Sequence, residues 1–382
     1  MFSYGNDKRK EKIKQFLIQA ICKGHLFVSD KQQNMSVSNI KGTSNYYLPS
    51  HVVIELTDAC NLKCVHCYRV YSRDEYKYID YDGVKDLLHA FSNETVCSVE
   101  FTDGEPTLHP NFLEIIKFAA QHFWLVGVLT NGTELSDEIL KELSLYKDRI
   151  FWSISLDSHD KNYHDKFRGK RGAWEETISN IKKLVSMGYY VRIAMCVTHE
   201  NIYHIENVAK LCTEIGIKAF SYSPVLPFGK ACNYIWQYDD IVKLSEIDKY
   251  VCQKYKNIIP SIQLKEFNQE HINENCGAGW KSIVVDPQFN VRPCVMADSS
   301  KDIIGSIKLS DTISFFEKQK EIINWWANLK SPRKEICGEC RFLNFCIPCP
   351  FRVRRLLESG FISREKCVWN NKYKIMMDFD YK

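Results

Sequence analysis

Three cysteines lie close enough in the sequence to share one metal centre. Cys60, Cys64 and Cys67 fall within the segment Thr57–Tyr68, with three and then two residues between them. A structural zinc site needs four ligands, whereas a 4Fe–4S cube held by three thiolates keeps one iron free for another ligand. The spacing therefore favours an iron–sulfur centre with an open iron. Spacing alone leaves two alternatives, which are three unrelated cysteines or a zinc loop that takes His66 as its fourth ligand.

A second group of cysteines gathers towards the C-terminus. Its members are Cys276, Cys294, Cys337, Cys340, Cys346, Cys349 and Cys367. The last five follow the pattern Cys-x2-Cys-x5-Cys-x2-Cys-x17-Cys, which is typical of a metal site. Taken alone, the pattern also fits a zinc ribbon held by Cys337, Cys340, Cys346 and Cys349. The other cysteines are scattered, mostly in apolar contexts, and are expected to be small buried side chains: Cys22, Cys97, Cys196, Cys212, Cys232 and Cys252.

Short β-rich runs alternate with amphipathic helical stretches over the first two thirds of the chain. The expected strands are Val52–Leu56, Ser98–Thr102, Leu125–Thr130, Ile150–Leu156, Val191–Val197 and Ala219–Ser223. The helical patterns between them are Tyr81–Phe91, Asn111–His122, Asp137–Leu143, Trp174–Met187 and Ile205–Ile215. This alternation predicts an α/β fold with a parallel sheet, open or barrel-like, whose site lies at the C-terminal ends of the strands.

Polar motifs follow these strands at the edge where a site is expected. The cysteine loop comes after the first strand, and Asp103-Gly104-Glu105-Pro106 comes after the second. Thr130-Asn131-Gly132 ends the third strand, and Ser155-Leu156-Asp157 ends the fourth, with Arg168 further on. Considered singly, each motif is as readily a turn or a cap as a site.

In this order and spacing, the cysteine loop and the strand-end motifs resemble the radical S-adenosylmethionine (SAM) superfamily over roughly residues 50–232. The resemblance implies a partial (β/α)6 TIM-like barrel. It also implies a 4Fe–4S cluster on Cys60, Cys64 and Cys67 whose free iron binds SAM, so that reductive cleavage releases a 5′-deoxyadenosyl radical. The SAM contacts it implies are His66, Gly104, Glu105, Asn131, Ser155, Asp157 and Arg168. Asp103 stands where the family carries a glycine.

The C-terminal cysteines resemble the SPASM domain, an appendage that holds two auxiliary 4Fe–4S clusters. That resemblance assigns Cys337, Cys340, Cys346 and Cys367 to the distal cluster. It assigns Cys276, Cys294 and Cys349 to the nearer one, which then has an open iron or a ligand other than cysteine. Five residues before the second cysteine of the array, the family glycine is replaced by Phe289.

These resemblances predict four segments along the chain. They are an N-terminal extension at 1–48, the barrel at 49–232, a helical bridge at 233–275 and the auxiliary-cluster domain at 276–382. Within them we expect further helices at Lys8–Lys23, Asp239–Lys256 and Asp311–Leu329, and a hairpin around Val284–Pro287.

The SPASM resemblance implies a peptide or protein substrate and an electron donor such as flavodoxin or ferredoxin. We expect a maturase of a ribosomally made peptide that forms a thioether or carbon–carbon crosslink. Alternatives within the same chemistry are a sulfatase-maturating type of enzyme and a haem or cofactor biosynthesis enzyme. An alternative of another class is a non-catalytic zinc or iron–sulfur binding protein.

Composition and charge argue against a nucleic-acid-binding, a membrane or a secreted protein. The net charge of +4 over 382 residues gives no reason to expect a nucleic-acid partner. Apolar runs such as Phe123–Leu129 are far shorter than a membrane span. The N-terminal residues carry early charges and mixed polar sequence rather than the apolar core of a secretion signal. We therefore expect a cytoplasmic protein with no membrane partner.

Overall fold

A computed structural model describes residues 18, 46–69, 75–94, 96–264, 275–298, 300–307 and 312–373. The chain divides into two units, Met1–Ile40 and Lys41–Lys382. Of the first unit only Ile18 is described, so the helix expected at Lys8–Lys23 otherwise lies outside the described residues. The four predicted segments remain a prediction, because the second unit is not divided further.

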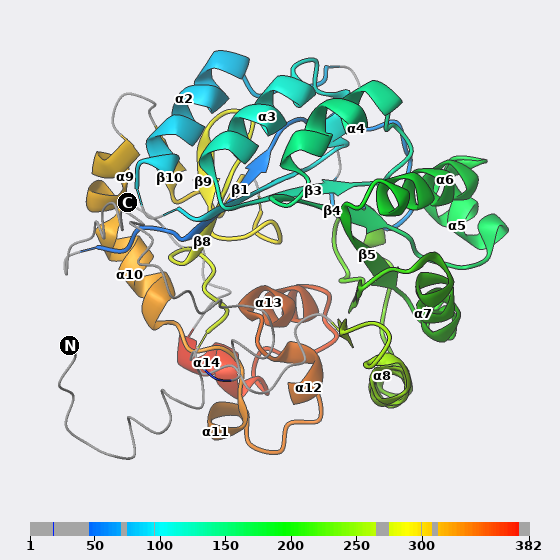
Figure 1. Cartoon of the computed structure of the whole chain (residues 1–382). Coiled ribbons are helices and arrows are strands. Elements are labelled where there is room, and N and C mark those ends of the chain that lie inside the picture. Colours follow the sequence, from blue (N-terminus) through cyan, green and yellow to red (C-terminus); the bar gives the residue numbers. More distant parts are fainter. Residues whose placement is uncertain are drawn as a thin grey trace. The chain divides into compact units, whose positions relative to one another are not determined.

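A ten-stranded sheet organises the second unit, in the order β10-β9-β8-β1-β2-β3-β4-β5-β6-β7 (Figure 1). All neighbouring strands from β8 to β7 run parallel, and β9 and β10 continue the sheet antiparallel. The strands are β1 His51–Glu55, β2 Ser98–Thr102, β3 Leu125–Thr130, β4 Ile150–Ser155, β5 Tyr190–Val197, β6 Ala219–Pro224, β7 Ser261–Leu264, β8 Ser282–Val285, β9 Asn290–Arg292 and β10 Gly305–Ser306. The predicted α/β fold and its six parallel strands are confirmed.

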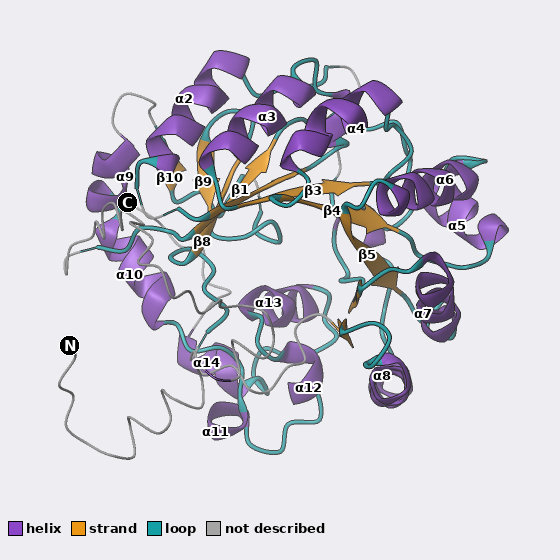
Figure 2. Cartoon of the chain, in the orientation of Figure 1, coloured by secondary structure: helices purple, strands orange, loops and turns teal. Residues whose placement is uncertain are grey.

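The barrel helices cover the outer face of this curved sheet, whereas the last C-terminal helices lie on its concave side (Figure 2). Those of the barrel are α2 Tyr81–Ser92, α3 Phe112–His122, α4 Asp137–Leu143, α5 Lys161–Arg168, α6 Ala173–Ser186, α7 His204–Ile215 and α8 Tyr238–Tyr255. The C-terminal ones are α9 Thr312–Lys318, α10 Lys320–Asn328, α11 Lys334–Cys337, α12 Leu343–Cys346, α13 Pro350–Glu358 and α14 Val368–Tyr373. Within the described residues the expected helices are found, except that the one at Asp311–Leu329 is broken at Gln319 into α9 and α10. Helix α5 was not predicted, because it is short and mainly polar.

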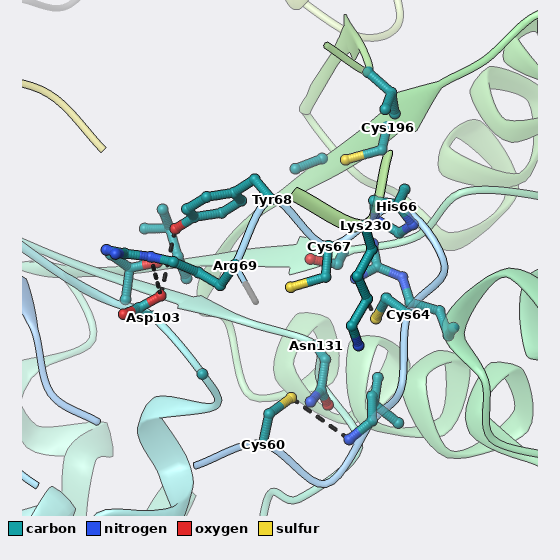
Figure 3. A pocket seen from close by; sticks show the side chains of 18 of the residues that line it. Cys60, Cys64, His66, Cys67, Tyr68, Arg69, Asp103, Asn131, Cys196 and Lys230 are labelled. Carbon is teal, nitrogen blue, oxygen red and sulfur yellow. Dashed lines mark hydrogen bonds and ion pairs between the residues drawn. The ribbon is translucent and has the colours of Figure 1, made fainter. Parts of the chain in front are cut away.

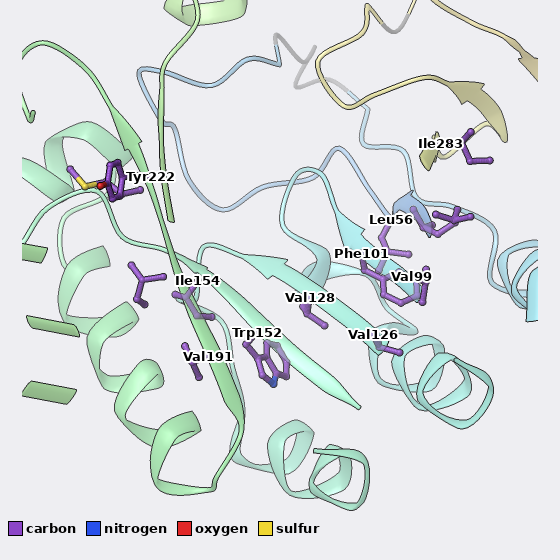
Figure 4. Packing of buried hydrophobic residues seen from close by; sticks show 14 of the residues in the cluster. Leu56, Val99, Phe101, Val126, Val128, Trp152, Ile154, Val191, Tyr222 and Ile283 are labelled. Carbon is purple, nitrogen blue, oxygen red and sulfur yellow. The ribbon is translucent and has the colours of Figure 1, made fainter. Parts of the chain in front are cut away.

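In two strands, β2 and β5, alternating burial separates the side chains that pack in the core from those left for a site. In β2 and β5, every second residue is buried, and these residues pack beneath the outer helices (Figure 4). Val99 and Phe101 of β2, Trp152 of β4 and Val191 of β5 belong to this core. Since successive side chains in a strand point to opposite faces, the intervening residues face the inside of the curve.

The C-terminal part of the chain completes the same sheet. Strand β8 pairs in parallel with β1, with His51 opposite Ser282, and turns back into β9. The predicted hairpin is therefore confirmed. At its turn Phe289 has a φ of 61°, so the residue in the family's glycine position keeps a left-handed backbone. No helix of the described residues is both long and apolar enough to cross a membrane.

Candidate functional site

A cavity of about 400 Å³ opens at the C-terminal ends of the barrel strands (Figure 3). Its wall is made by strand ends, the cysteine loop, the segment after β6 and Met296 from the C-terminal part. Most of the predicted site residues line it: Cys60, Cys64, His66, Cys67, Gly104, Asn131, Ser155 and Arg168. Glu105 and Asp157 are fully buried and lie outside the lining. The structure thus gathers residues that are up to 108 positions apart in the sequence at one edge of the sheet.

The cysteine loop is held by backbone hydrogen bonds to three other segments. The Lys63 amide donates to the Arg168 carbonyl at 3.1 Å, and the Lys230 amide donates to the Cys67 carbonyl at 2.9 Å. The Glu105 amide donates to the carbonyl of Ala59, just before Cys60, at 2.7 Å. The loop position is therefore set by the ends of β2, α5 and β6 rather than by the loop itself.

Two glycines allow these segments to lie against the loop. Gly104 has a φ of 50°, and a Cβ there would lie 2.2 Å from the carbonyl oxygen of Ala59. Gly169, the C-cap of α5, has a φ of 69°, and a Cβ there would lie 2.5 Å from the carbonyl oxygen of Lys63. A side chain at either position would push the loop away, so both motif glycines are required by close backbone approach.

Asp103 has a left-handed backbone at the position where the resemblance implies a glycine. Its φ is 73°, and its carboxylate receives the Tyr68 hydroxyl at 3.4 Å and pairs with Arg69 Nε at 3.3 Å. Aspartate tolerates the left-handed region better than most residues. The replacement therefore preserves the backbone geometry and adds an anchor for the two residues after Cys67.

Glu105 joins the ends of β2 and β3. Its carboxylate accepts hydrogen bonds from the Thr130 hydroxyl at 2.6 Å, the Asn131 amide at 2.8 Å and the Thr107 hydroxyl at 2.8 Å. Burial raises the pKa of Glu105 even though these donors act in the opposite direction. These contacts give Glu105 a structural role, while its predicted contact with SAM remains a prediction.

A buried ion pair lies behind the cysteine loop. Arg168 Nε donates to Asp157 at 2.5 Å, and Arg168 Nη1 lies 3.8 Å from Cys64 Sγ. Burial alone would raise the pKa of Asp157, but the Arg168 guanidinium, together with His66 and His164, holds that pKa below its ordinary value. The guanidinium is thereby fixed beside a cysteine of the triad, where it can meet an anionic group in the cavity.

His66 is a neutral aromatic wall of the cavity. Its ring stacks on Phe167 with centroids 4.0 Å apart and an angle of 11° between the ring planes. Burial and the nearby Arg168 lower the pKa of His66 to about 3. Its Nδ1 is buried without a hydrogen-bond partner among the described residues. A neutral imidazole stacked in this way can serve as a flat surface for a second ring.

Cys196 was expected to be a small buried side chain, yet it lines the cavity. Its amide donates to Asp157 at 2.9 Å, and its Sγ lies within 4.8 Å of ligand atoms of His66 and Asp157. The parity of β5 could have revealed this, because Val191 and Met195 pack outwards and Cys196 then faces inwards. Lys230, which sequence reasoning did not assign to the site, also extends into the cavity (Figure 3).

A second cavity, of about 450 Å³, lies in the C-terminal part between α11, α12 and α14. Cys337, Cys340, Cys346 and Cys367 line it, and Cys349 does not. Burial raises the pKa of Cys346 well above its ordinary value, and the neighbouring Cys340 and Cys367 add to the effect. The four thiols are the set that the SPASM resemblance implies for the distal cluster, rather than the zinc-ribbon set that includes Cys349.

The remaining three array cysteines lie elsewhere in the C-terminal part. Cys276 precedes β8, Cys294 follows β9, and Cys349 is the N-cap residue of α13. Cys276 is exposed, whereas Cys294 and Cys349 are half-buried.

Comparison with known proteins decides the family. The sequence model of the Radical SAM superfamily matches residues 54–212. The antilisterial bacteriocin subtilosin biosynthesis protein AlbA of Bacillus subtilis is 34% identical over 334 residues, which cover 86% of this chain and 72% of AlbA. The chain belongs to the radical SAM superfamily. It is therefore an enzyme of the kind that uses SAM and a 4Fe–4S cluster.

Two further likenesses accompany this assignment. The sporulation killing factor maturation protein SkfB of Bacillus subtilis is 26% identical, over 68% of this chain and 63% of SkfB. The crystal structure of Streptococcus suis SuiB bound to its precursor peptide SuiA has a TM-score of 0.57 at 18% identity, covering 90% of this chain and 86% of SuiB. The SuiB likeness concerns the fold.

The donor set of the main cavity suits the groups that a radical SAM chain carries. Burial raises the pKa of Cys60 to about 12 and that of Cys67 above its ordinary value, and neighbouring thiolates add to both shifts. Cys60 and Cys67 ionise in this setting only if a cationic centre compensates their charge, as an iron–sulfur cluster does. The stacked His66 and the fixed Arg168 offer an aromatic and a cationic contact beside them. The residues present therefore fit both a cluster and SAM.

Proposed function

We propose that this radical SAM enzyme modifies a ribosomally made peptide. The observation that carries the proposal is the 34% identity to AlbA, a bacteriocin biosynthesis protein, over 86% of the chain. A peptide-maturing activity is also named for SkfB, and SuiB has been seen with a precursor peptide bound. The expected product carries a thioether or a carbon–carbon crosslink.

Cys60, Cys64 and Cys67 are the proposed ligands of the cluster that binds SAM. Their shared position in one cavity, next to Arg168, supports this assignment. When bound, the cluster and SAM together supply one-electron reductive cleavage of SAM, which provides a radical able to remove a hydrogen atom from the substrate. An electron donor such as flavodoxin or ferredoxin would deliver that electron.

The other lining residues bind and orient SAM in this proposal. Arg168, held by Asp157, offers its guanidinium to the SAM carboxylate, which is the geometry that favours arginine over lysine. The Asn131 amide and the Ser155 hydroxyl line the same wall and are suited to polar contacts with the ribose or the amine. His66 presents its ring to the adenine. Gly104 and Glu105 hold the strand ends around these groups.

Two auxiliary 4Fe–4S clusters complete the proposal and make the C-terminal part a SPASM domain. Cys337, Cys340, Cys346 and Cys367 are assigned to the distal one, and their gathering around one cavity supports this set. Cys276, Cys294 and Cys349 are assigned to the nearer one, which has three cysteines and so an iron open to a further ligand. Such clusters can accept the electron that remains when a substrate radical becomes a closed-shell product.

Metal analysis and product analysis together test the proposal. Anaerobically reconstituted protein should hold about twelve irons with matching sulfide per chain. With SAM, reductant and a candidate precursor peptide, it should form 5′-deoxyadenosine and a peptide lighter by the hydrogens lost at each new bond. The variant in which Cys60, Cys64 and Cys67 are all alanine should form neither product. SAM cleavage by that triple variant would refute the assignment, and about four irons with one zinc would remove the auxiliary clusters.

A further inference from the structure

A buried carboxylate at the end of β1 joins two distant parts of the chain. Glu55 is 1% exposed, and its two oxygens pair with different guanidinium groups. One oxygen receives Arg69 Nη2 and the other receives Arg292 Nη2, so a single side chain is shared between partners 223 residues apart in sequence. Both arginines are largely buried, with side chains 12% and 0% exposed.

Each arginine fixes a different segment that borders the main cavity. Arg69 follows Cys67 by two residues, and its Nε also pairs with Asp103 at 3.3 Å. Arg292 precedes Cys294 by two residues, and its Nη1 donates to the Ala297 carbonyl at 3.0 Å. The turn that Arg292 closes contains Met296, which lines the cavity. Glu55 thus connects the cysteine loop to a wall contributed by the C-terminal part.

The charges within this group balance, with two carboxylates and two guanidinium groups. In a buried site such a balance is needed, because removing one partner leaves an uncompensated charge and is strongly destabilising. A buried ionic group contributes little to net stability compared with apolar packing, yet it demands one particular geometry. This group of buried charges is therefore better suited to fixing the positions of the segments it joins than to stabilising the fold.

We propose that Glu55 is a positioning residue that fixes the cysteine loop, residues 60–69, relative to the cavity turn, residues 290–297. Its consequence for catalysis rests on the proposed function, since the loop and the turn then carry ligands of two different clusters. The link itself is a property of the protein alone. It can therefore be tested in metal-free protein, where failure of the link and failure of the proposed function are separate results.

Hydrogen–deuterium exchange in the metal-free full chain tests the link. Glu55→Gln should speed amide exchange at least about tenfold in both the loop and the turn, because both arginines lose their shared anion. Strands β3 to β5, which do not contact Glu55, should exchange as in the wild type. Glu100→Gln is the matched control, since Glu100 lies on the neighbouring β2, is 22% exposed and pairs only distantly with His51 at 3.8 Å. That control should change neither segment.

Single-arginine variants keep the test decisive if Glu55→Gln fails to fold. Arg69→Gln leaves the Glu55–Arg292 pair in place and should loosen the loop but not the turn. Arg292→Gln should do the reverse. In reconstituted enzyme, Arg69→Gln should also lower the ratio of modified peptide to 5′-deoxyadenosine. Exchange that rises equally throughout the sheet, or in neither segment, would overturn the proposal whatever the activity.

Discussion

Replacing Gly169 by alanine tests whether the motif glycine after Arg168 holds the cysteine loop. Gly169 and Gly216 are both helix C-caps with left-handed backbones, at φ values of 69° and 88°. Alanine in that conformation costs about 1–2 kcal/mol at either position. At Gly216 nothing lies within 4 Å of the new Cβ, whereas at Gly169 the Lys63 carbonyl oxygen would lie at 2.5 Å. Ordinary contacts begin at 3.4 Å, so Lys63 and the adjoining Cys64 must move by about 1 Å.

The two variants should therefore differ in stability and in metal content. Overpacking of this kind costs a further ~1–3 kcal/mol, so Gly169→Ala should lose about 2–5 kcal/mol of unfolding free energy against about 1–2 for Gly216→Ala. Urea unfolding of the metal-free proteins measures this difference. After reconstitution, Gly216→Ala should hold the wild-type amount of iron, and Gly169→Ala should hold less. Equal losses of stability, or full iron content in both, would refute the close-approach argument.

Three further predictions concern the thiols and the buried carboxyl. Cys64→Ala should lower the iron content by about four atoms per chain and abolish SAM cleavage. Cys196→Ala, in the same cavity, should keep the wild-type iron content. Iron loss in both variants would contradict the assigned triad. Cys367→Ala should likewise remove about four irons, and unchanged iron or bound zinc would disprove the distal set. Because burial raises the pKa of Glu105, its contribution to stability is full below the ordinary carboxyl pKa of 4.5 and declines as pH rises through the raised value. The free energy of unfolding, measured from pH 4.5 to 8, should fall with pH in the wild type and fall less in Glu105→Gln. Parallel curves for the two proteins would contradict this role of Glu105.

The sequence predicted those parts of the molecule that depend on local pattern. Strand–helix alternation determines the parallel sheet, and a parallel sheet brings the ends of its strands to one edge. That is why the sequence alone predicts that Cys60, Gly104, Asn131 and Ser155 lie together. The set of four thiols around the second cavity followed from the resemblance, because spacing alone left the zinc ribbon with Cys349 open as an alternative.

What the sequence could not predict depends on contacts between distant residues. Arg292 and Glu55 are separated by 237 positions, and neither lies in a recognisable motif. Asp103 and Phe289 stand where the resemblances imply glycines, and sequence alone does not tell whether the backbone changes with the residue. In the fold both keep a positive φ, at 73° and 61°. For Asp103 the hydrogen bond from Tyr68 and the ion pair with Arg69 provide a physical reason.

The pairing of β8 with β1 bears on how such enzymes can be recombined. Strand β1 leads directly into the cysteine loop, and β8 is its hydrogen-bonded neighbour on the side away from β2. A chimera that took everything after residue 276 from a relative would import a foreign partner for the strand that precedes the triad. Grafts that exchange only the segment beyond β9 would leave that edge intact. A truncation at 276 would therefore expose an unpaired edge of β1 that is prone to aggregation.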